Sequence, residues 1–379
     1  MAKRVAVVGV AQTACRASMK ENSRDITYNL VKGLLDEAGL KREDIGTIIS
    51  GTSDWSTGIA CSNEYFIDAY GGFGKSMSKT EEDSALAFVY AVMRVMSGHY
   101  DLAIAHGITK MSEIPDPSTI STFVGNPFFE RQFGLQKYSA AALQCRLYMD
   151  KCGITHEQMA KVVEKNRRNA TKNPFAHLRK AVSVNKVMKS GTVASPLREL
   201  DISPQSDGAC AILIASEEKA KQFTKKPAWV AGMGWAVDHS VFSDRDLLNQ
   251  VLPDAAKRAY GMAGIKDPVK DIDVAEVCDR FSFEEMLWYE GLGFCKKGEG
   301  GKIMDKGLTQ MDGRLPVNPS GGVLASNPYC ARGLVRIGEA ALQVMGKAED
   351  RQIPRAKCAL AHSTHGLAGQ HHTVVVLKG

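Results

Sequence analysis

Two segments far apart in the chain carry side chains that can take up and release protons. Three consecutive acids at 81–83 precede one apolar stretch, and Tyr329 precedes another. The Gly-rich segment HSTHGLAG, at 362–369, adds two histidines. Carboxylate, phenol and imidazole groups are those that enzymes use as general acids and bases. These residue types favour proton-transfer chemistry if the fold brings the segments together.

The nine cysteines include no CxxC pair and no metal-type spacing with histidine. We expect them to be reduced and buried, as in a cytosolic protein. No cysteine lies between Cys61 and Cys145, so the acids at 81–83 have no thiol near them in the sequence. A metal site built from the histidines and Glu81 would have unspecific spacing, and we expect no metal.

The elements that must position these groups alternate between strand and helix. VAVVGVA, at 5–11, is a continuous apolar run, which is typical of a strand covered on both faces. The first 112 residues predict further strands at 45–50 and 102–106 and helices at 26–38 and 81–96. The last 150 residues repeat this order, with helices at 247–263 and 331–345 and strands at 229–237, 274–277, 358–362 and 373–377.

Local phrases repeat as well, since DEAGLKREDIGTIISG at 36–51 parallels GMAGIKDPVKDIDVAEVCD at 261–279. Repetition at an interval of about 225 to 256 residues predicts two similar α/β halves rather than a solenoid. The block between them is rich in Met, Phe and basic residues and suggests an insertion over the first half. We expect an N-terminal half at 1–112, a loop domain with a return to that half at 113–225, and a C-terminal half at 226–379.

The repeat also aligns the two proton-transferring segments. Gly98 and Gly346 close the corresponding helices, and counting back 17 residues from each glycine reaches Glu81 and Tyr329. In open α/β sheets ligands bind beyond the carboxyl ends of the strands, where helix N-termini point. Halves related by pseudo-twofold symmetry would turn both helix starts toward one central cavity. The acids at 81–83 equally suit a helix N-terminus without any catalytic role.

Composition excludes several classes of protein. The net charge of +6 arises from 48 basic and 42 acidic residues that are scattered, which argues against a nucleic-acid partner. No apolar run approaches the roughly 18 residues that a membrane-spanning helix needs. The N-terminal MAKRVAVVGVAQT predicts a buried strand rather than a targeting peptide. We therefore expect a cytoplasmic protein that contacts neither membrane nor nucleic acid.

Longer motifs carry a family resemblance. They are DVAEVCDRFSFEE at 273–285, GLGFCKKGEGG at 291–301, GRLPVNPSGG at 313–322, SPQSDGACAILIAS at 203–216 and SGHYDLAIAHGITKMS at 97–112. The chain resembles the thiolase superfamily, specifically its sterol-carrier or lipid-transfer-protein type. The resemblance implies an α/β thiolase fold. Its duplicated βαβαβαββ halves form a five-layer α/β/α/β/α sandwich with an inserted loop domain, usually as a homodimer.

The chain departs from this family at the catalytic positions. The resemblance places Glu81 where the family has its nucleophilic cysteine, Cys278 where it has the histidine of HDCF, and Asn327 where it has the histidine of GHP. A thiolase needs a thiolate that becomes an acyl thioester, and Glu81 cannot supply one. Cys278 or Cys330 is either a relocated nucleophile or a small buried residue. Tyr329 is either a proton-transferring group or a packing aromatic.

The pocket for coenzyme A is expected to persist, with coenzyme A as part of the substrate and no prosthetic group. By resemblance, Ser203 contacts the pantetheine, and Lys189 and Ser190 are phosphate or pantetheine neighbours. A lone basic residue in a loop is usually just solvated. The closest pattern in the superfamily is that of aldolases that shorten steroid side chains together with a small zinc-ribbon/OB-fold partner subunit.

Retro-aldol cleavage of a bulky β-hydroxyacyl-CoA fits these observations because it needs a base and an enolate site but no nucleophile. The resemblance then implies Tyr329 as general base or proton relay, His365 as a candidate donor and Asn327 as a group that holds the enolate or a water. Two alternatives stay open. One is a 3-oxoacyl-CoA thiolase or acyltransferase with a relocated thiol, and the other is a non-catalytic subunit of a heteromeric complex.

Overall fold

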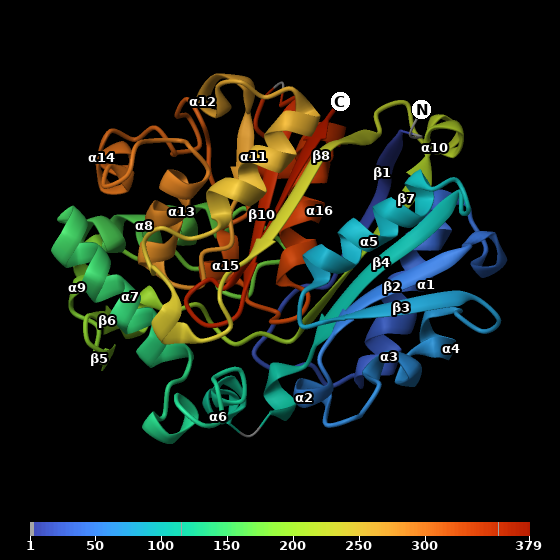
Figure 1. Ribbon diagram of the computed structural model, residues 1–379. Coiled ribbons are helices and arrows are strands. Elements are labelled where there is room, and N and C mark those ends of the chain that lie inside the picture. The colour runs from blue at the N-terminus through green and yellow to red at the C-terminus, as the bar shows by residue number, and fades with distance from the viewer. Residues whose placement is uncertain (1–3, 115, 355) are drawn as a thin grey trace.

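The computed structural model describes residues 4–114, 116–354 and 356–379, and within them nine strands form one mixed sheet (Figure 1). The order across the sheet is β3-β2-β4-β7-β1-β8-β11-β10-β9. The strands are β1 (Val5–Gln12), β2 (Thr47–Thr52), β3 (Ser76–Glu81), β4 (Leu102–Thr109), β7 (Gly208–Ser216), β8 (Ala228–Val237), β9 (Val274–Glu276), β10 (Cys358–His365) and β11 (His371–Lys378).

The sheet consists of two halves that join where β1 pairs with β8 through only two residue pairs, Ala6 with Trp229 and Val7 with Ala228. Outward from this junction, β7, β4 and β2 on one side correspond to β11, β10 and β9 on the other. The edge strand β3 corresponds to a single parallel bridge between Ala275 and Val317. The duplication that the sequence predicts is therefore confirmed, with a reduced edge in the second half.

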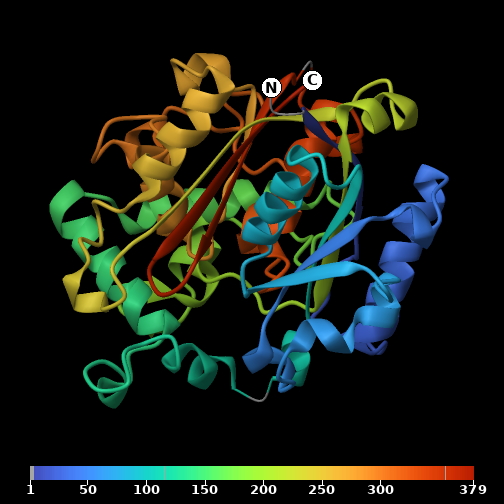
Figure 2. The same cartoon turned by 45° about the vertical axis from the view of Figure 1, so that its right-hand side comes forward.

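Helices form three layers around the two sheet halves (Figures 1 and 2). Helices α5 (Ser84–Met96) and α16 (Arg332–Met345) pack against each other in the central layer and share one apolar core with both halves. Helix α1 (Ser23–Ala38) covers the outer face of the first half, and α11 (Leu252–Ala263) covers that of the second. This arrangement is the expected five-layer α/β/α/β/α sandwich.

The block between the halves is helical. It contains α6 (Pro117–Thr122), α7 (Lys137–Cys152), α8 (His156–Ala170), α9 (Val184–Met188), the hairpin of β5 (Thr192–Ala194) and β6 (Leu197–Arg198), and α10 (Glu217–Phe223) after β7. The sequence suggests that this block lies over the first half, but α8 packs against α13 (Ser282–Gly291), α14 (Gly300–Asp305) and α15 (Gly322–Ala325) of the second. The amphipathic face of α8 buries Met159, Val162 and Val163 there.

Short helices complete the chain: α2 (Asp54–Thr57), α3 (Ser62–Tyr65), α4 (Ile67–Tyr70) and α12 (Pro268–Asp271). In the part of the chain that the structure describes, no helix combines the length and apolar character needed to cross a membrane.

The sequence misses β3, and with it the start of the central helix. The strand SMSKTE is polar because it lies at the sheet edge, where only Thr80 is buried. Helix α5 consequently begins at Ser84 rather than at the expected residue 81, and Asp83 is its N-cap. The Asp83 carboxylate accepts hydrogen bonds from the backbone N–H groups of Ala85 and Leu86, at 2.9 and 3.2 Å.

Candidate active site

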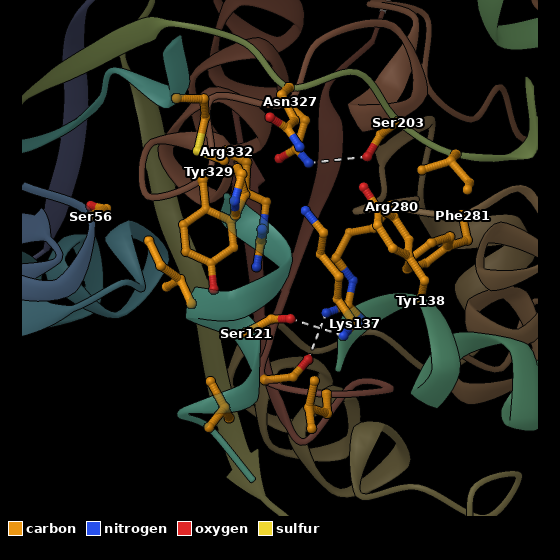
Figure 3. A pocket seen from close by; sticks show the side chains of 18 of the residues that line it. Ser56, Ser121, Lys137, Tyr138, Ser203, Arg280, Phe281, Asn327, Tyr329 and Arg332 are labelled. Carbon is orange, nitrogen blue, oxygen red and sulfur yellow. Dashed lines mark hydrogen bonds between the residues drawn. The ribbon is translucent and has the colours of Figure 1, made fainter. Parts of the chain in front are cut away.

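A cavity opens between the helical block and the N-termini of the central helices (Figure 3). Its wall is largely apolar, with Met111, Ile114, Ile120, Val124, Ile202 and Phe281. Three of the expected site residues, Ser203, Asn327 and Tyr329, line it together with the cations Lys137, Arg280 and Arg332. A mostly apolar pocket with a few convergent polar groups is typical of a small-molecule site.

Tyr329 and His365 meet on one buried carboxylate, that of Glu82. The Tyr329 hydroxyl donates to Oε2 of Glu82 at 2.8 Å. Nε2 of His365 lies 3.4 Å from the same oxygen. Glu82 is only 6% exposed, and its other oxygen accepts a 3.4 Å hydrogen bond from Ser53. Phenol, carboxylate and imidazole from three separate segments therefore form one proton-transfer group beside the cavity.

The backbone of Glu82 lies in the left-handed region, with φ of 57°, between β3 and α5. Such a conformation costs a non-Gly residue roughly 1–2 kcal/mol and is often found at functional sites. Its N–H donates to the carbonyl of Thr52 at 2.9 Å. Gly51 allows the turn to approach β2, because a Cβ there would lie 2.4 Å from Cα of Ser84. The close packing of α5 on the strands thus enforces the strained backbone conformation of Glu82.

Glu81, which the sequence predicts at this position, points elsewhere. Its side chain is 42% exposed and pairs with Lys79 at 2.8 Å. It also accepts a hydrogen bond from the backbone N–H of Asp54 at 2.9 Å. Glu81 is the last residue of β3, and successive side chains of a strand point to opposite faces. The acid that reaches Tyr329 is therefore Glu82, one residue later.

Burial sets the protonation state of the tyrosine and the histidine. Burial and the charge of Glu82 raise the pKa of Tyr329 well above its usual value, although Arg332, 4.7 Å from the ring centre, opposes this. Burial lowers the pKa of His365, against the opposing pull of Glu82 and Asp83. Tyr329 is consequently a neutral phenol and His365 a neutral imidazole near pH 7.

Asn327 and Ser203 are coupled on the far side of the cavity. Nδ2 of Asn327 donates to Oγ of Ser203 at 3.0 Å, and the backbone N–H of Asn327 donates to Oγ of Ser206 at 3.1 Å. Oδ1 of Asn327 is buried without a hydrogen-bond partner among the described residues. A buried unpaired acceptor of this kind is expected to receive a donor from a ligand or an ordered water.

The two candidate thiols lie outside the cavity lining. Cys278 is fully buried, and its Sγ lies 4.0 Å from the carbonyl of Thr364. Burial raises its pKa despite the charges of Arg332 and Arg280. Burial and the charge of Glu82 raise the pKa of Cys330 to about 12. Neither sulfur has an imidazole as hydrogen-bond partner within the described chain, so both have the properties of buried thiols rather than of activated nucleophiles.

Lys189 and Ser190 are placed away from the cavity. They line a separate, open surface hollow with Lys186 and Glu199, and Lys189 is exposed. The Ser190 hydroxyl donates to the carbonyl of Val187 in the preceding helix, α9. The structure does not bring this pair together with Tyr329.

Sequence reasoning missed several residues of the site. Arg280 lies within the motif CDRF, and Arg332 lies three residues after Tyr329. Both line the cavity, and their positions in or beside these motifs could have identified them. Asp83 forms a 3.0 Å ion pair with His371, which lowers the pKa of Asp83 although burial alone would raise it. The sequence contains no signal for this last contact, because it joins the N-cap of α5 to the first residue of β11, far away in the chain.

Comparison with known proteins agrees with this architecture. Residues 5–218 match the family described as "Thiolase, N-terminal domain", and residues 234–378 match "Thiolase C-terminal domain-like". The chain superposes on the Ltp2-ChsH2(DUF35) aldolase with a TM-score of 0.86 at 21% identity, over 100% of this chain and 98% of that one. The TM-score is 0.74 for human mitochondrial 3-ketoacyl-CoA thiolase at 16% identity, over 100% and 99%. At such identities these two superpositions show the fold alone.

Relatives of higher identity carry different names. An acetyl-CoA acetyltransferase of Methanothermobacter thermautotrophicus is 34% identical over 375 residues, which are 96% of this chain and 97% of that protein. Human sterol carrier protein 2 is 30% identical over 97% of this chain and 70% of its own length. The benzoylsuccinyl-CoA thiolase subunit BbsB of Thauera aromatica is 32% identical over 74% and 73%. The chain thus belongs to the thiolase family, in which it resembles the sterol-carrier type.

Proposed function

We propose that this thiolase-family enzyme cleaves a bulky β-hydroxyacyl-CoA by a retro-aldol reaction, without a covalent acyl-enzyme. The observation that carries the proposal is the 2.8 Å hydrogen bond from Tyr329, which lines the cavity, to the buried carboxylate of Glu82 behind it. No cysteine is among the described residues that line this cavity. The acyl group occupies the apolar cavity, and coenzyme A, a part of the substrate, reaches it past Ser203.

The proposed proton path begins at the β-hydroxyl of the substrate. Tyr329 accepts this proton while its phenolic proton passes to Glu82, so that no free phenolate forms. This concerted relay suits the raised pKa of Tyr329, which disfavours a persistent phenolate. The Cα–Cβ bond breaks, Cβ becomes a ketone or aldehyde carbonyl, and the electron pair passes into the thioester as an enolate.

The enolate then has to be held and protonated at Cα. Asn327 has one N–H that is not used by Ser203, and it lies on the cavity wall. Arg332 adds positive charge beside Tyr329. The proton stored on Glu82 returns through Tyr329 to Cα, and His365, neutral and 3.4 Å from Glu82, is a second route for it. The shortened acyl-CoA leaves, and the site is regenerated without net proton uptake.

An acyltransferase is the second candidate, and the relatives named acetyl-CoA acetyltransferase favour it. It requires Cys278 or Cys330 as a relocated nucleophile. The raised pKa values of both thiols and their absence from the cavity lining weigh against this candidate.

The proposed assembly is a homodimer of this chain. A small zinc-ribbon/OB-fold subunit is its proposed partner. Support for a heteromeric complex comes from two names: the superposed aldolase is a complex with a DUF35 chain, and BbsB is a subunit. Such a partner would cover the entrance for coenzyme A, while the catalytic groups come from this chain.

The direct test is product analysis with purified chain, alone and with a small partner subunit, on β-hydroxyacyl-CoA thioesters with tertiary hydroxyls. We expect release of a ketone and a shortened acyl-CoA. Tyr329→Phe and Glu82→Gln should each lower kcat by about a hundredfold or more, because both interrupt the relay.

Glu81→Gln is the matched control, since it removes a neighbouring carboxylate that faces solvent, and kcat should stay within about twofold of wild type. Full turnover in the complex with Tyr329→Phe would instead assign the chain a non-catalytic role. Absence of ketone release from every thioester would contradict the lyase.

A further inference from the structure

The cavity holds three cationic side chains, and only one of them forms an ion pair among the described residues. Arg280 forms an ion pair with Glu284 and donates to the carbonyl of Gly366 at 2.7 Å. Arg332 donates to the carbonyl of Thr364 at 3.1 Å and stacks on Tyr329. Within the described chain no carboxylate oxygen lies within 4.0 Å of a side-chain nitrogen of Arg332 or Lys137. Among the described residues, two positive charges therefore face a largely apolar cavity without a direct ion-pair partner.

Lys137 is held in this position by the fold. It is the first residue of α7, and its backbone N–H donates to Oγ of Ser121 in α6 at 3.0 Å. Its ammonium lies 4.8 Å from the ring centre of Tyr138. Figure 3 shows its side chain extending into the cavity between Tyr329 and Arg332 on one side and Tyr138 and Arg280 on the other. The N-terminus of α7 adds its own positive potential there.

Nearby acids are committed to other partners. Asp116, whose charge acts on Lys137, is exposed and caps α6 through the N–H of Ser118 at 2.9 Å and the hydroxyl of Thr119 at 2.6 Å. Glu82 is bound by Tyr329 and His365. Burial lowers the pKa of Lys137 to about 8, so the side chain is still mainly an ammonium at pH 7. A charge placed in an apolar cavity without a partner is costly, and a bound anion removes that cost.

We propose that the acyl group in this cavity carries its own carboxylate, so that the substrate is the coenzyme A monothioester of a dicarboxylic acid, and that Lys137 binds the free carboxylate. Arg332, on the opposite wall, adds to the attraction. This inference rests on the proposed function only in taking the cavity as the acyl site of a coenzyme A thioester. It adds a charge to the predicted bulky, apolar acyl group. The alternative source of an anion is a phosphate of coenzyme A itself.

Binding of two matched thioesters separates these sources. Octanoyl-CoA and octanedioyl-CoA have the same chain length, differ in one terminal carboxylate, and lack the β-hydroxyl that cleavage requires. Isothermal titration calorimetry should show octanedioyl-CoA binding about tenfold or more tightly, the effect of one charge-assisted hydrogen bond. Lys137→Met should abolish this preference and leave octanoyl-CoA unaffected, whereas Lys137→Arg should retain most of it.

Lys151→Met, on the exposed end of the same helix, is the control and should bind both thioesters like wild type. Equal or tighter binding of octanoyl-CoA to wild type would overturn the proposal. Equal weakening of both thioesters by Lys137→Met would assign the lysine to a coenzyme A phosphate and overturn it too. Since neither thioester can be cleaved, these binding affinities do not depend on whether the lyase reaction occurs.

Discussion

At the scale of single residues, the proposed reaction uses a buried phenol–carboxylate pair in place of a thiol. Glu82 is held in a backbone conformation that favours glycine, and its carboxylate gathers Tyr329 and His365 on one oxygen. A backbone strained in this way persists only where surrounding packing enforces it. The arrangement places a proton acceptor within one hydrogen bond of Tyr329, which lines the cavity.

The thiols should be dispensable for the reaction. Cys278→Ala and Cys330→Ala should each retain kcat within about twofold, because neither raised-pKa thiol supplies a nucleophile. Circular dichroism melting provides the control for folding, since removing a buried sulfur costs some stability. Loss of all turnover in a folded Cys330→Ala variant would favour the acyltransferase.

At the scale of elements, the turn from β3 into α5 determines the site, and it is also where sequence reasoning was least complete. Several buried strands and the central helices were predictable because their apolar runs are continuous, as in β1 and β4. Strand β3 was not, because an edge strand exposes polar side chains and its pattern resembles a loop. Because this strand was not predicted, the expected helix start fell at Glu81. Glu81 rather than Glu82 was consequently expected to be the acid of the site.

The candidate site was predictable only where its residues lie within or beside recognisable sequence motifs. Tyr329, Asn327 and Ser203 were located by motif, and all three line the cavity. Lys189 and Ser190 lie in a separate hollow, and their predicted contact with coenzyme A stays a prediction. Lys137 had no signal, because its importance depends on which acids surround it in space rather than in the chain.

The close packing of α5 on β2 can be tested with two glycines. Gly51→Ala should lower the free energy of unfolding by about 2 kcal/mol or more and reduce activity, because its Cβ would meet backbone atoms of Ser84. Gly33→Ala, in the exposed middle of α1 with no atom within 4 Å of the new Cβ, should raise it by about 0.5–1 kcal/mol. Urea titration checks both, and a neutral Gly51→Ala would contradict the packing account.

At the scale of the whole molecule, buried neutral histidines should make stability depend on pH. Burial lowers the pKa values of His106 and His362 to about 3 and that of His372 well below its usual value. His362 and His372 are hydrogen-bonded at 3.0 Å, whereas both ring nitrogens of His106 are buried without a partner among the described residues.

These histidines stay neutral in the folded state, whereas in the unfolded chain they bind protons below about pH 6.5. Their contribution to the free energy of unfolding is therefore present above that pH and is lost as the pH falls. Each histidine should add a slope of about 1.4 kcal/mol per pH unit to the free energy of unfolding between roughly pH 6 and pH 4. His106→Phe should reduce the slope by this amount in urea titrations. An unchanged slope would show that His106 takes up a proton in the folded protein.

We propose that the family's thioester site works in this chain without an acylated thiol. The most direct measurement combines product analysis with intact-protein mass spectrometry during turnover of a bulky β-hydroxyacyl-CoA in the absence of free coenzyme A. We expect one ketone and one shortened acyl-CoA per substrate, with no acyl adduct on the chain. An acylated peptide containing Cys278 or Cys330, or cleavage only when free coenzyme A is added, would contradict it.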